Sequence, residues 1–159
     1  VLAPVGQRPV VTVNPRYQWL WVMAFVEPIT GRNVWFLMPY LNAKVFQIVL
    51  DAFAQELALP QDTGVVLVVD QAPWHIAKCI EAPVGFELLF LPPYSPELQP
   101  AEHLWALSDE VLFNQNFEDL DALQDAFSEQ CVLLERDVER VKSMTCFDWW
   151  ERAVTTLMN

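Results

Sequence analysis

Residues 65–105 read VVLVVDQAPWHIAKCIEAPVGFELLFLPPYSPELQPAEHLW, and this stretch decides the fold. The run from Val65 to Asp70 consists of Val and Leu up to a carboxylate. This is the pattern of a strand buried on both faces in an α/β sheet. Asp70 then lies at the carboxyl end of the strand, where open sheets place their ligands. An Asp also commonly starts a turn such as residues 70–73, and taken alone Asp70 favours that simpler interpretation.

A second apolar run, Phe86–Leu91, leads into a proline-rich connection that is neither helix nor central strand. A helix is predicted to begin near Gln99 or Pro100, because proline is favoured at the first helical position and apolar residues follow at helical spacing. Glu102 falls in the first turn of that helix. A carboxylate at this position is equally suited to capping the helix start and to chemistry.

The two motifs together resemble those of a known family. The segments VVDQAPWH (68–75) and LFLPPYSPELQPAEHLW (89–105) are similar to the core of bacterial insertion-sequence transposases related to the mariner elements, which are DDE superfamily endonucleases. In that family an Asp at a strand end is followed by Asn or Gln and a His, and a Pro-Pro-Tyr-Ser-Pro motif leads to a catalytic Glu. The resemblance implies that Asp70 and Glu102 are the second and third catalytic acids.

The resemblance covers nearly the whole chain. It also includes VLAPVGQRPVV (1–11), YQWLWVMAFVEPITGRNVWFLMP (17–39), FEDLDALQDAF (117–127) and ERVKSMTCFDW (139–149). In the family, the first catalytic Asp lies on a strand upstream of the segment that resembles residues 1–11, so no residue of this chain matches it. Glu27 does not replace that acid, since it lies at the wrong end of a predicted hairpin.

The fold implied by the resemblance is an α/β, ribonuclease H-like (retroviral-integrase-like) mixed sheet with flanking helices, here without its first strand. Residues 10–13 or a second chain are the open alternatives for filling that place. A hairpin is predicted at 17–38, and a helix capped by Asn42 is predicted to end before Pro60. We expect a single truncated catalytic domain over residues 1–159, with a sheet core and its motifs at 1–115 and a helical tail at 116–159.

The resemblance implies Mg²⁺ or Mn²⁺ as cofactor, in a two-metal site of the complete enzyme. Hard divalent cations prefer oxygen ligands, which explains an acidic triad, and Asp70 and Glu102 are the predicted metal ligands here. Gln71, Trp74 and His75 are expected to contact DNA or phosphate. His75 is also suited to contacting an acid or to simple packing, and Trp74 to the core.

The charge limits what the chain does alone. It carries 9 Lys and Arg against 21 Asp and Glu, a formal net charge of −12, whereas DNA-binding proteins present a basic surface. The resemblance implies a catalytic-domain fragment of a DDE transposase, for metal-dependent DNA cleavage and strand transfer, and we expect it to be inactive alone because the first Asp is absent. DNA (transposon ends) is the partner expected for the complete protein, and a homodimer is left open. The alternative is a folded, non-catalytic remnant that acts as an interaction or oligomerisation module.

The sequence shows no long apolar window and no signal-peptide pattern. We expect a cytoplasmic bacterial protein with no membrane partner, associated with the nucleoid when bound to DNA. The three cysteines, Cys79, Cys131 and Cys146, are far apart, and we expect reduced, mostly buried thiols.

Overall fold

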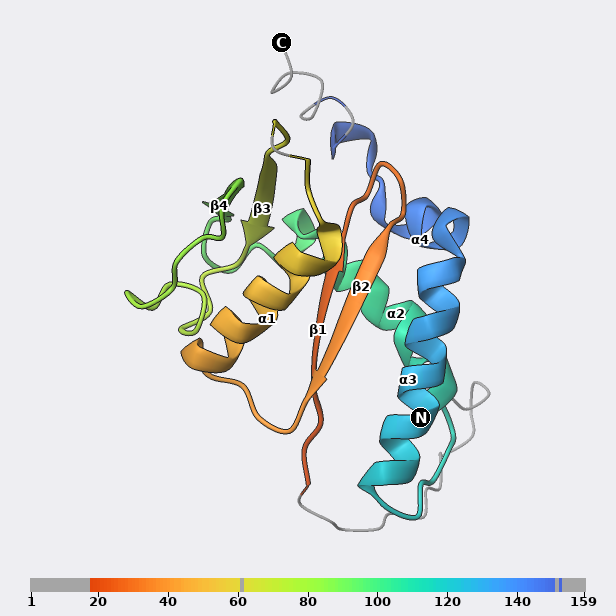
Figure 1. The fold of residues 1–159 in the computed structure, drawn as a ribbon. Helices are drawn as coiled ribbons and strands as arrows, with labels where there is room; N and C mark the ends of the chain where they lie inside the picture. Colours follow the sequence, from red (N-terminus) through yellow and green to blue (C-terminus); the bar gives the residue numbers. More distant parts are fainter. Residues whose placement is uncertain (1–17, 61, 151, 153–159) are drawn as a thin grey trace.

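The computed structural model describes residues 18–60, 62–150 and 152 (Figure 1). The expected strand at residues 10–13 lies outside the described residues. In chain order the helices and strands, with η denoting 3₁₀ helices, are β1 (Trp21–Val26), β2 (Asn33–Met38), α1 (Ala43–Leu57), β3 (Val65–Val69), β4 (Phe86–Phe90), η1 (Pro96–Leu98), η2 (Pro100–His103), α2 (Leu104–Ser108), η3 (Asp109–Leu112), α3 (Leu120–Arg136) and α4 (Val138–Thr145).

The hairpin is present as predicted. β1 pairs antiparallel with β2, with Trp21 opposite Met38 and Val26 opposite Asn33. Aromatic and β-branched residues fill both strands, which suits a pleated, half-buried surface. In the turn, the hydroxyl of Thr30 donates a hydrogen bond of 2.7 Å to the carboxylate of Glu27. Glu27 is therefore a turn residue.

β3 pairs parallel with β4, with Val65 opposite Phe86 and Val69 opposite Phe90. The prediction that this apolar run is buried on both faces is wrong, because Val69 is its single fully buried residue. Val66 on β3 and Leu89 on β4 are each 49% exposed. A strand with one paired neighbour and a helix on one face leaves its other face in solvent, which an apolar sequence alone does not reveal.

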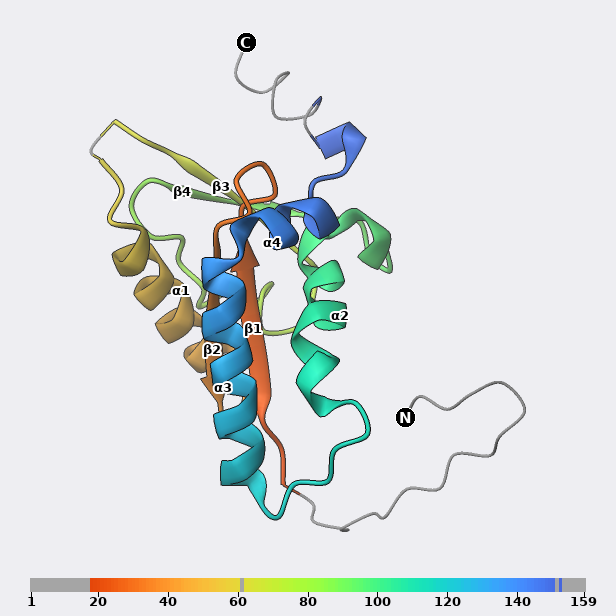
Figure 2. The ribbon, with the colours of Figure 1, turned by 90° about the vertical axis from the view of Figure 1, so that its right-hand side faces the viewer.

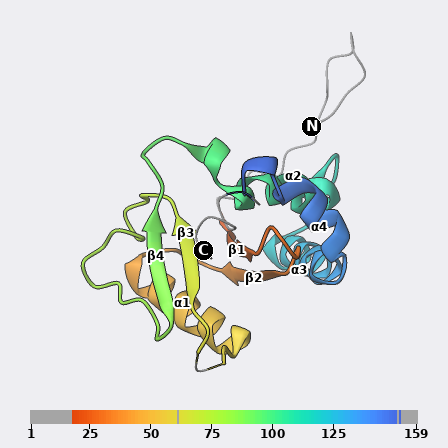
Figure 3. The same ribbon diagram turned by 90° about the horizontal axis from the view of Figure 1, so that it is seen from above.

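The four strands form two separate two-stranded sheets. Figures 1 and 3 show β3 on the side of its sheet that faces the hairpin. In the view of Figure 1, β1 is the hairpin strand on the side of β3. Helix α1 covers both sheets from one face. The cluster beneath it draws apolar residues from the hairpin, α1 and both strands of the parallel pair, including Phe25, Phe53, Leu67 and Phe86.

Helix α1 begins and ends as predicted. The side chain of Asn42 accepts a hydrogen bond of 3.0 Å from the backbone N–H of Val45, which satisfies one of the free donors at the helix start. The helix is capped at Ala58, which has a positive φ of 45°. Phe46, Leu50 and Phe53 are buried on its inner face.

The opposite face of the hairpin carries the other helices. Figure 2 shows α2 and α3 flanking the hairpin on that side, with α4 above them. The cluster there is formed by the buried residues Trp35, Leu104, Leu107, Phe127, Cys131, Leu134 and Val141. The segment after the proline-rich connection is therefore anchored by a core of its own.

Two further predictions concern membrane-spanning segments and the thiols. Among the described residues, no helix combines the length and apolar character needed to cross a bilayer. Of the cysteines, Cys131 is buried, Cys146 is partly buried and Cys79 is exposed. The expectation of mostly buried thiols is wrong for Cys79, because it lies in the irregular segment between β3 and β4, which lacks a covering helix.

Candidate metal-binding site

Asp70 follows directly on the last residue of β3. The end of the parallel pair is fastened by two hydrogen bonds: the N–H of Leu91 donates to the carbonyl of Val69 at 2.8 Å, and the side-chain amide of Gln71 donates to the carbonyl of Leu91 at 2.9 Å. The ladder thus continues one step past β4 and holds the chain that carries Asp70. The carboxyl ends of parallel strands are where ligands bind in α/β sheets.

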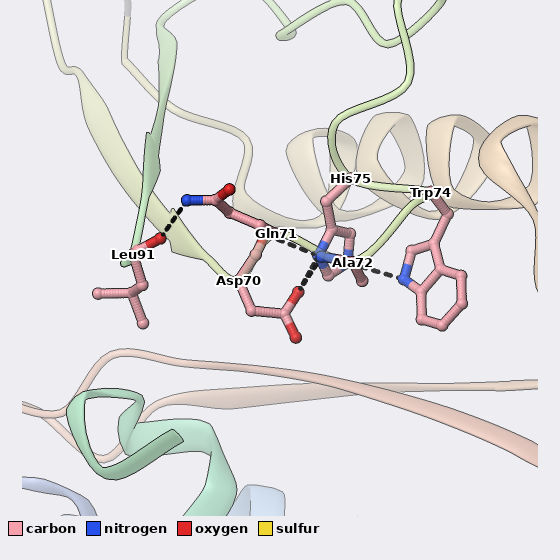
Figure 4. A network of polar contacts seen from close by, with 6 residues as sticks. All are labelled: Asp70, Gln71, Ala72, Trp74, His75 and Leu91. Carbon is pink, nitrogen blue, oxygen red and sulfur yellow. Dashed lines mark hydrogen bonds and ion pairs between the residues drawn. The ribbon is translucent and has the colours of Figure 1, made fainter. Parts of the chain in front are cut away.

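The two oxygens of the Asp70 carboxylate differ in their surroundings: one is held by contacts within the loop and the other is not (Figure 4). Its Oδ1 atom accepts a hydrogen bond of 3.0 Å from the N–H of Ala72 and lies 2.5 Å from Nδ1 of His75. Its Oδ2 atom accepts no hydrogen bond from the residues that the structure describes, and Figure 4 shows it pointing away from the labelled side chains. The side chain is 51% exposed. The bond to Ala72 is that of an Asp-initiated turn, so the turn role and a ligand role coexist on separate oxygens.

His75 contacts the carboxylate of Asp70, and Trp74 contacts His75. The indole Nε1 of Trp74 lies 3.1 Å from Nε2 of His75, and the His75 side chain is only 12% exposed. The imidazole packs on the ring of Phe46 in α1 with centroids 4.4 Å apart. Trp74 meets Trp21 of β1 edge to face at 5.9 Å. The sequence suggested that His75 contacts either a phosphate or an acid, and in the structure it contacts the acid Asp70.

Glu102 lies in η2, the first turn after the proline-rich connection. The predicted helix start at Pro100 is confirmed, although the first turn is 3₁₀ and becomes α-helical at Leu104. Glu102 is exposed, and its carboxylate makes no hydrogen bond or ion pair with the described residues. η2 has no side-chain cap. The capping role weighed from the sequence is therefore not seen, and the carboxylate oxygens are free to bind a ligand.

Strand β1 contacts both segments that carry the acids, the loop of Asp70 and η2 with Glu102. Its first residue, Trp21, contacts the loop of Asp70 through Trp74, and β1 also packs against η2, which carries Glu102. Glu27 follows the opposite end of β1, as expected from the sequence. Among the described residues, no group of three or more His, Cys, Asp or Glu side chains is arranged to hold a metal ion.

The pairing of Asp70 with His75 is the feature of the site that was hardest to predict from the sequence. Its signal is an Asp at a strand end with a His five residues later, but the contact depends on the turn that starts at Ala72. That turn is closed by the N–H of His75, which donates to the carbonyl of Ala72 at 2.9 Å. The support from Phe46 comes from a helix that precedes β3 in the chain, and no local spacing announces it.

The family model described as DDE superfamily endonuclease matches residues 1–124. The uncharacterized protein y4pE/y4sA of Sinorhizobium fredii (strain NBRC 101917 / NGR234) is 35% identical over 106 residues, which are 65% of this chain and 76% of that protein.

Among solved structures, the fold is similar to the crystal structure of the Mos1 strand transfer complex, with a TM-score of 0.61 and 20% identity. The match covers 98% of this chain and 48% of that one, so the chain spans about half the length of the solved protein. This similarity confirms the predicted α/β, ribonuclease H-like fold class. The match of the family model over residues 1–124 places the chain in a family: it belongs to the DDE superfamily endonucleases.

Proposed function

We propose that this chain supplies two carboxylates, Asp70 and Glu102, of the metal site of a transposase that cleaves DNA and transfers its strands. The observation that carries the proposal is the state of Asp70: it lies at the end of β3 with one oxygen held by hydrogen bonds and the other free. A surface Asp with only a turn role has no need of a buried imidazole behind it. Glu102 adds a second free carboxylate on a segment that packs against the same strand, β1.

The donor set fits a hard divalent cation. DDE superfamily endonucleases generally use divalent metals, and carboxylate oxygens suit Mg²⁺ or Mn²⁺, the ions we propose here. When bound, such ions stabilise the attacking and leaving oxygens of a phosphoryl transfer. The protein's part is to hold Asp70 and Glu102 in place. The exposed amide of Gln71, whose N–H₂ group is bound to Leu91, leaves its oxygen for a metal-bound water or a donor on the substrate.

A further acid is needed for the usual three-carboxylate site. Residues 1–17 contain neither Asp nor Glu, and the described residues hold no three-ligand group. We propose that the first Asp is carried by a strand of the same polypeptide that precedes residue 1 and inserts between β1 and β3. Within the part of the chain that the structure describes, no strand pairs with the edges of β1 and β3 that lie toward each other in Figure 1, which supports this place. A strand there would also cover part of the exposed β3 and end beside Asp70.

DNA is the proposed substrate of the complete protein, and the cytoplasm, at the nucleoid, is the proposed place of its activity. The formal charge of −12 opposes contact with phosphates by this chain alone. DNA affinity is therefore assigned to residues outside this chain, and the acidic part described here is assigned to the metal. The domain division into a sheet core at 1–115 and a helical tail at 116–159 belongs to the same proposal.

Calorimetric titration with Mn²⁺ tests the metal assignment. We expect the wild-type chain to bind weakly, and Asp70→Asn and Glu102→Gln each to weaken binding about 10-fold or more, because each removes a charged ligand. Glu97→Gln, which neutralises another exposed acid of the same motif, is the matched control and is expected to bind like the wild type. Equal Mn²⁺ affinity in all four proteins would remove the assignment.

The second candidate function is a folded, non-catalytic module for interaction or oligomerisation. The absence of a three-ligand group among the described residues favours it, together with the charge of −12. It predicts a defined dimer by analytical ultracentrifugation with no Mn²⁺ binding. Metal-dependent nicking of DNA by this chain would rule it out.

A further inference from the structure

The hydrogen bonds around His75 fix which of its ring nitrogens carries the proton. An indole N–H only donates, so Nε2 of His75 must accept the 3.1 Å bond from Trp74 and carries no proton. In the neutral ring the proton then lies on Nδ1, which donates to Oδ1 of Asp70 at 2.5 Å. Both nitrogens of His75 are thus engaged within the chain.

Both rings are held by elements outside the loop. The imidazole rests on Phe46, which is 1% exposed and belongs to α1. The indole of Trp74 meets Trp21 of β1 edge to face. Because these partners belong to α1 and β1, outside the loop itself, His75 has little freedom to turn away from Asp70.

The consequence for Asp70 is a single carboxylate orientation. Two donors, the N–H of Ala72 and Nδ1 of His75, converge on Oδ1. Rotation of the carboxylate would break both bonds, so Oδ2 remains the oxygen directed to solvent. Metal ligands in proteins are commonly oriented by such outer partners, whose removal typically costs about 10- to 100-fold in metal affinity.

We propose that Trp74 and His75 are positioning residues which hold Oδ1 of Asp70 and so present Oδ2 to a divalent cation. This assigns them a role through Asp70, in place of direct contact with DNA or phosphate. The metal part of the inference rests on the proposed function. The proton position on His75 does not, since it follows from the hydrogen bonds of the free protein.

The first test is nuclear magnetic resonance of ¹⁵N-histidine-labelled protein, using long-range ¹⁵N–¹H correlations of the neutral imidazole. We expect His75 to show the Nδ1–H tautomer. In Trp74→Phe, which keeps an aromatic ring and loses the N–H, we expect a shift toward the Nε2–H tautomer. Trp149→Phe removes an indole N–H elsewhere and is expected to leave His75 unchanged. An Nε2–H tautomer in the wild type would overturn the proposal.

The second test is Mn²⁺ affinity in the same proteins, with folding checked by circular dichroism. We expect His75→Ala to lower the affinity about 10-fold. His75→Asn is expected to restore most of it, because its side-chain N–H₂ lies near the position of Nδ1 and can donate to Asp70. Equal affinity of wild type, His75→Ala and Trp74→Phe would contradict a positioning role. Absence of Mn²⁺ binding in a wild type with the Nδ1–H tautomer would overturn the proposed function and the metal role of this pair, while leaving the hydrogen-bond assignment intact.

Discussion

The indole rings of Trp21 and Trp74 meet edge to face with their centroids 5.9 Å apart. This contact joins β1 of the hairpin to the loop after β3, a strand of the other sheet. Since Trp74 in turn donates to His75 and His75 contacts Asp70, the order of the candidate site depends on a residue of β1.

Replacing Trp21 by Ala therefore should loosen the loop more than it destabilises the fold. Trp21 is 39% exposed, so we expect a loss of about 1–2 kcal/mol in the free energy of unfolding. Hydrogen exchange should show lower protection of the Ala72 amide, which donates to Asp70. Unchanged protection of that amide would show that the Trp21–Trp74 contact does not order the loop.

Gly31 is where the hairpin turn meets the junction of α3 and α4. Its φ is +76°, and a Cβ atom there would lie 1.9 Å from the carbonyl oxygen of Val138. Gly31→Ala combines backbone strain with a clash against backbone, and we expect a loss of about 3 kcal/mol or more in urea denaturation. Gly64→Ala is the control, because its Cβ would lie 3.8 Å from the nearest atom, the carbonyl oxygen of Gly85. A loss as large in the control would refute the local explanation.

Asn33 is a buried polar bridge between the hairpin and α3. Its amide donates to the carbonyls of Gly31 and Leu134 at 2.9 and 3.0 Å, and its oxygen accepts from the indole of Trp35 at 2.6 Å. Asn33→Ala leaves these buried groups without hydrogen-bond partners, and we expect a loss of about 3 kcal/mol in the free energy of unfolding. The exposed Asn116→Ala should change the unfolding midpoint little. A mild effect of Asn33→Ala would mean that water replaces the amide.

Much of the fold was predictable from local patterns. The hairpin, the Asn42 cap and the start of η2 at Pro100 each follow from a few neighbouring residues whose preferences are strong. The exposure of β3 was not predictable, because burial of an apolar strand depends on which strands and helices lie beside it. The same holds for the contact of Phe46 with His75, which joins a helix and a loop 29 positions apart.

The candidate site was predictable only in its acids. Asp70 and Glu102 came from motifs, whereas the use of each Asp70 oxygen depends on the turn geometry at Ala72 and His75. The roles now proposed for Trp74 and His75 differ from the expected contact with DNA or phosphate for the same reason. Each ring can both form hydrogen bonds and pack against apolar side chains. A sequence pattern does not state which side of such a ring meets its partner.

Cys131 provides a pH-dependent test of the α3 core. Burial, with a smaller contribution from the negative charge of Glu135, raises the pKa of its thiol from 9.0 to about 12. The unfolded chain loses this proton near pH 9 and the folded chain retains it, so Cys131 adds no pH dependence below pH 9 and favours unfolding as pH rises from 9 toward 12. At neutral pH we expect a thiol reagent to label the exposed Cys79 quickly and Cys131 only after unfolding. Equal labelling rates in the native protein would contradict the burial.

The central claim, that Asp70 and Glu102 serve one metal site, is tested most directly by paramagnetic broadening of backbone amide signals on adding Mn²⁺. We predict that the signals around both residues broaden together at the lowest Mn²⁺ concentrations, and that Asp70→Asn reduces the broadening at both. Broadening at Glu102 that is unaffected by Asp70→Asn, or broadening spread evenly over the exposed acids of the chain, would contradict the claim.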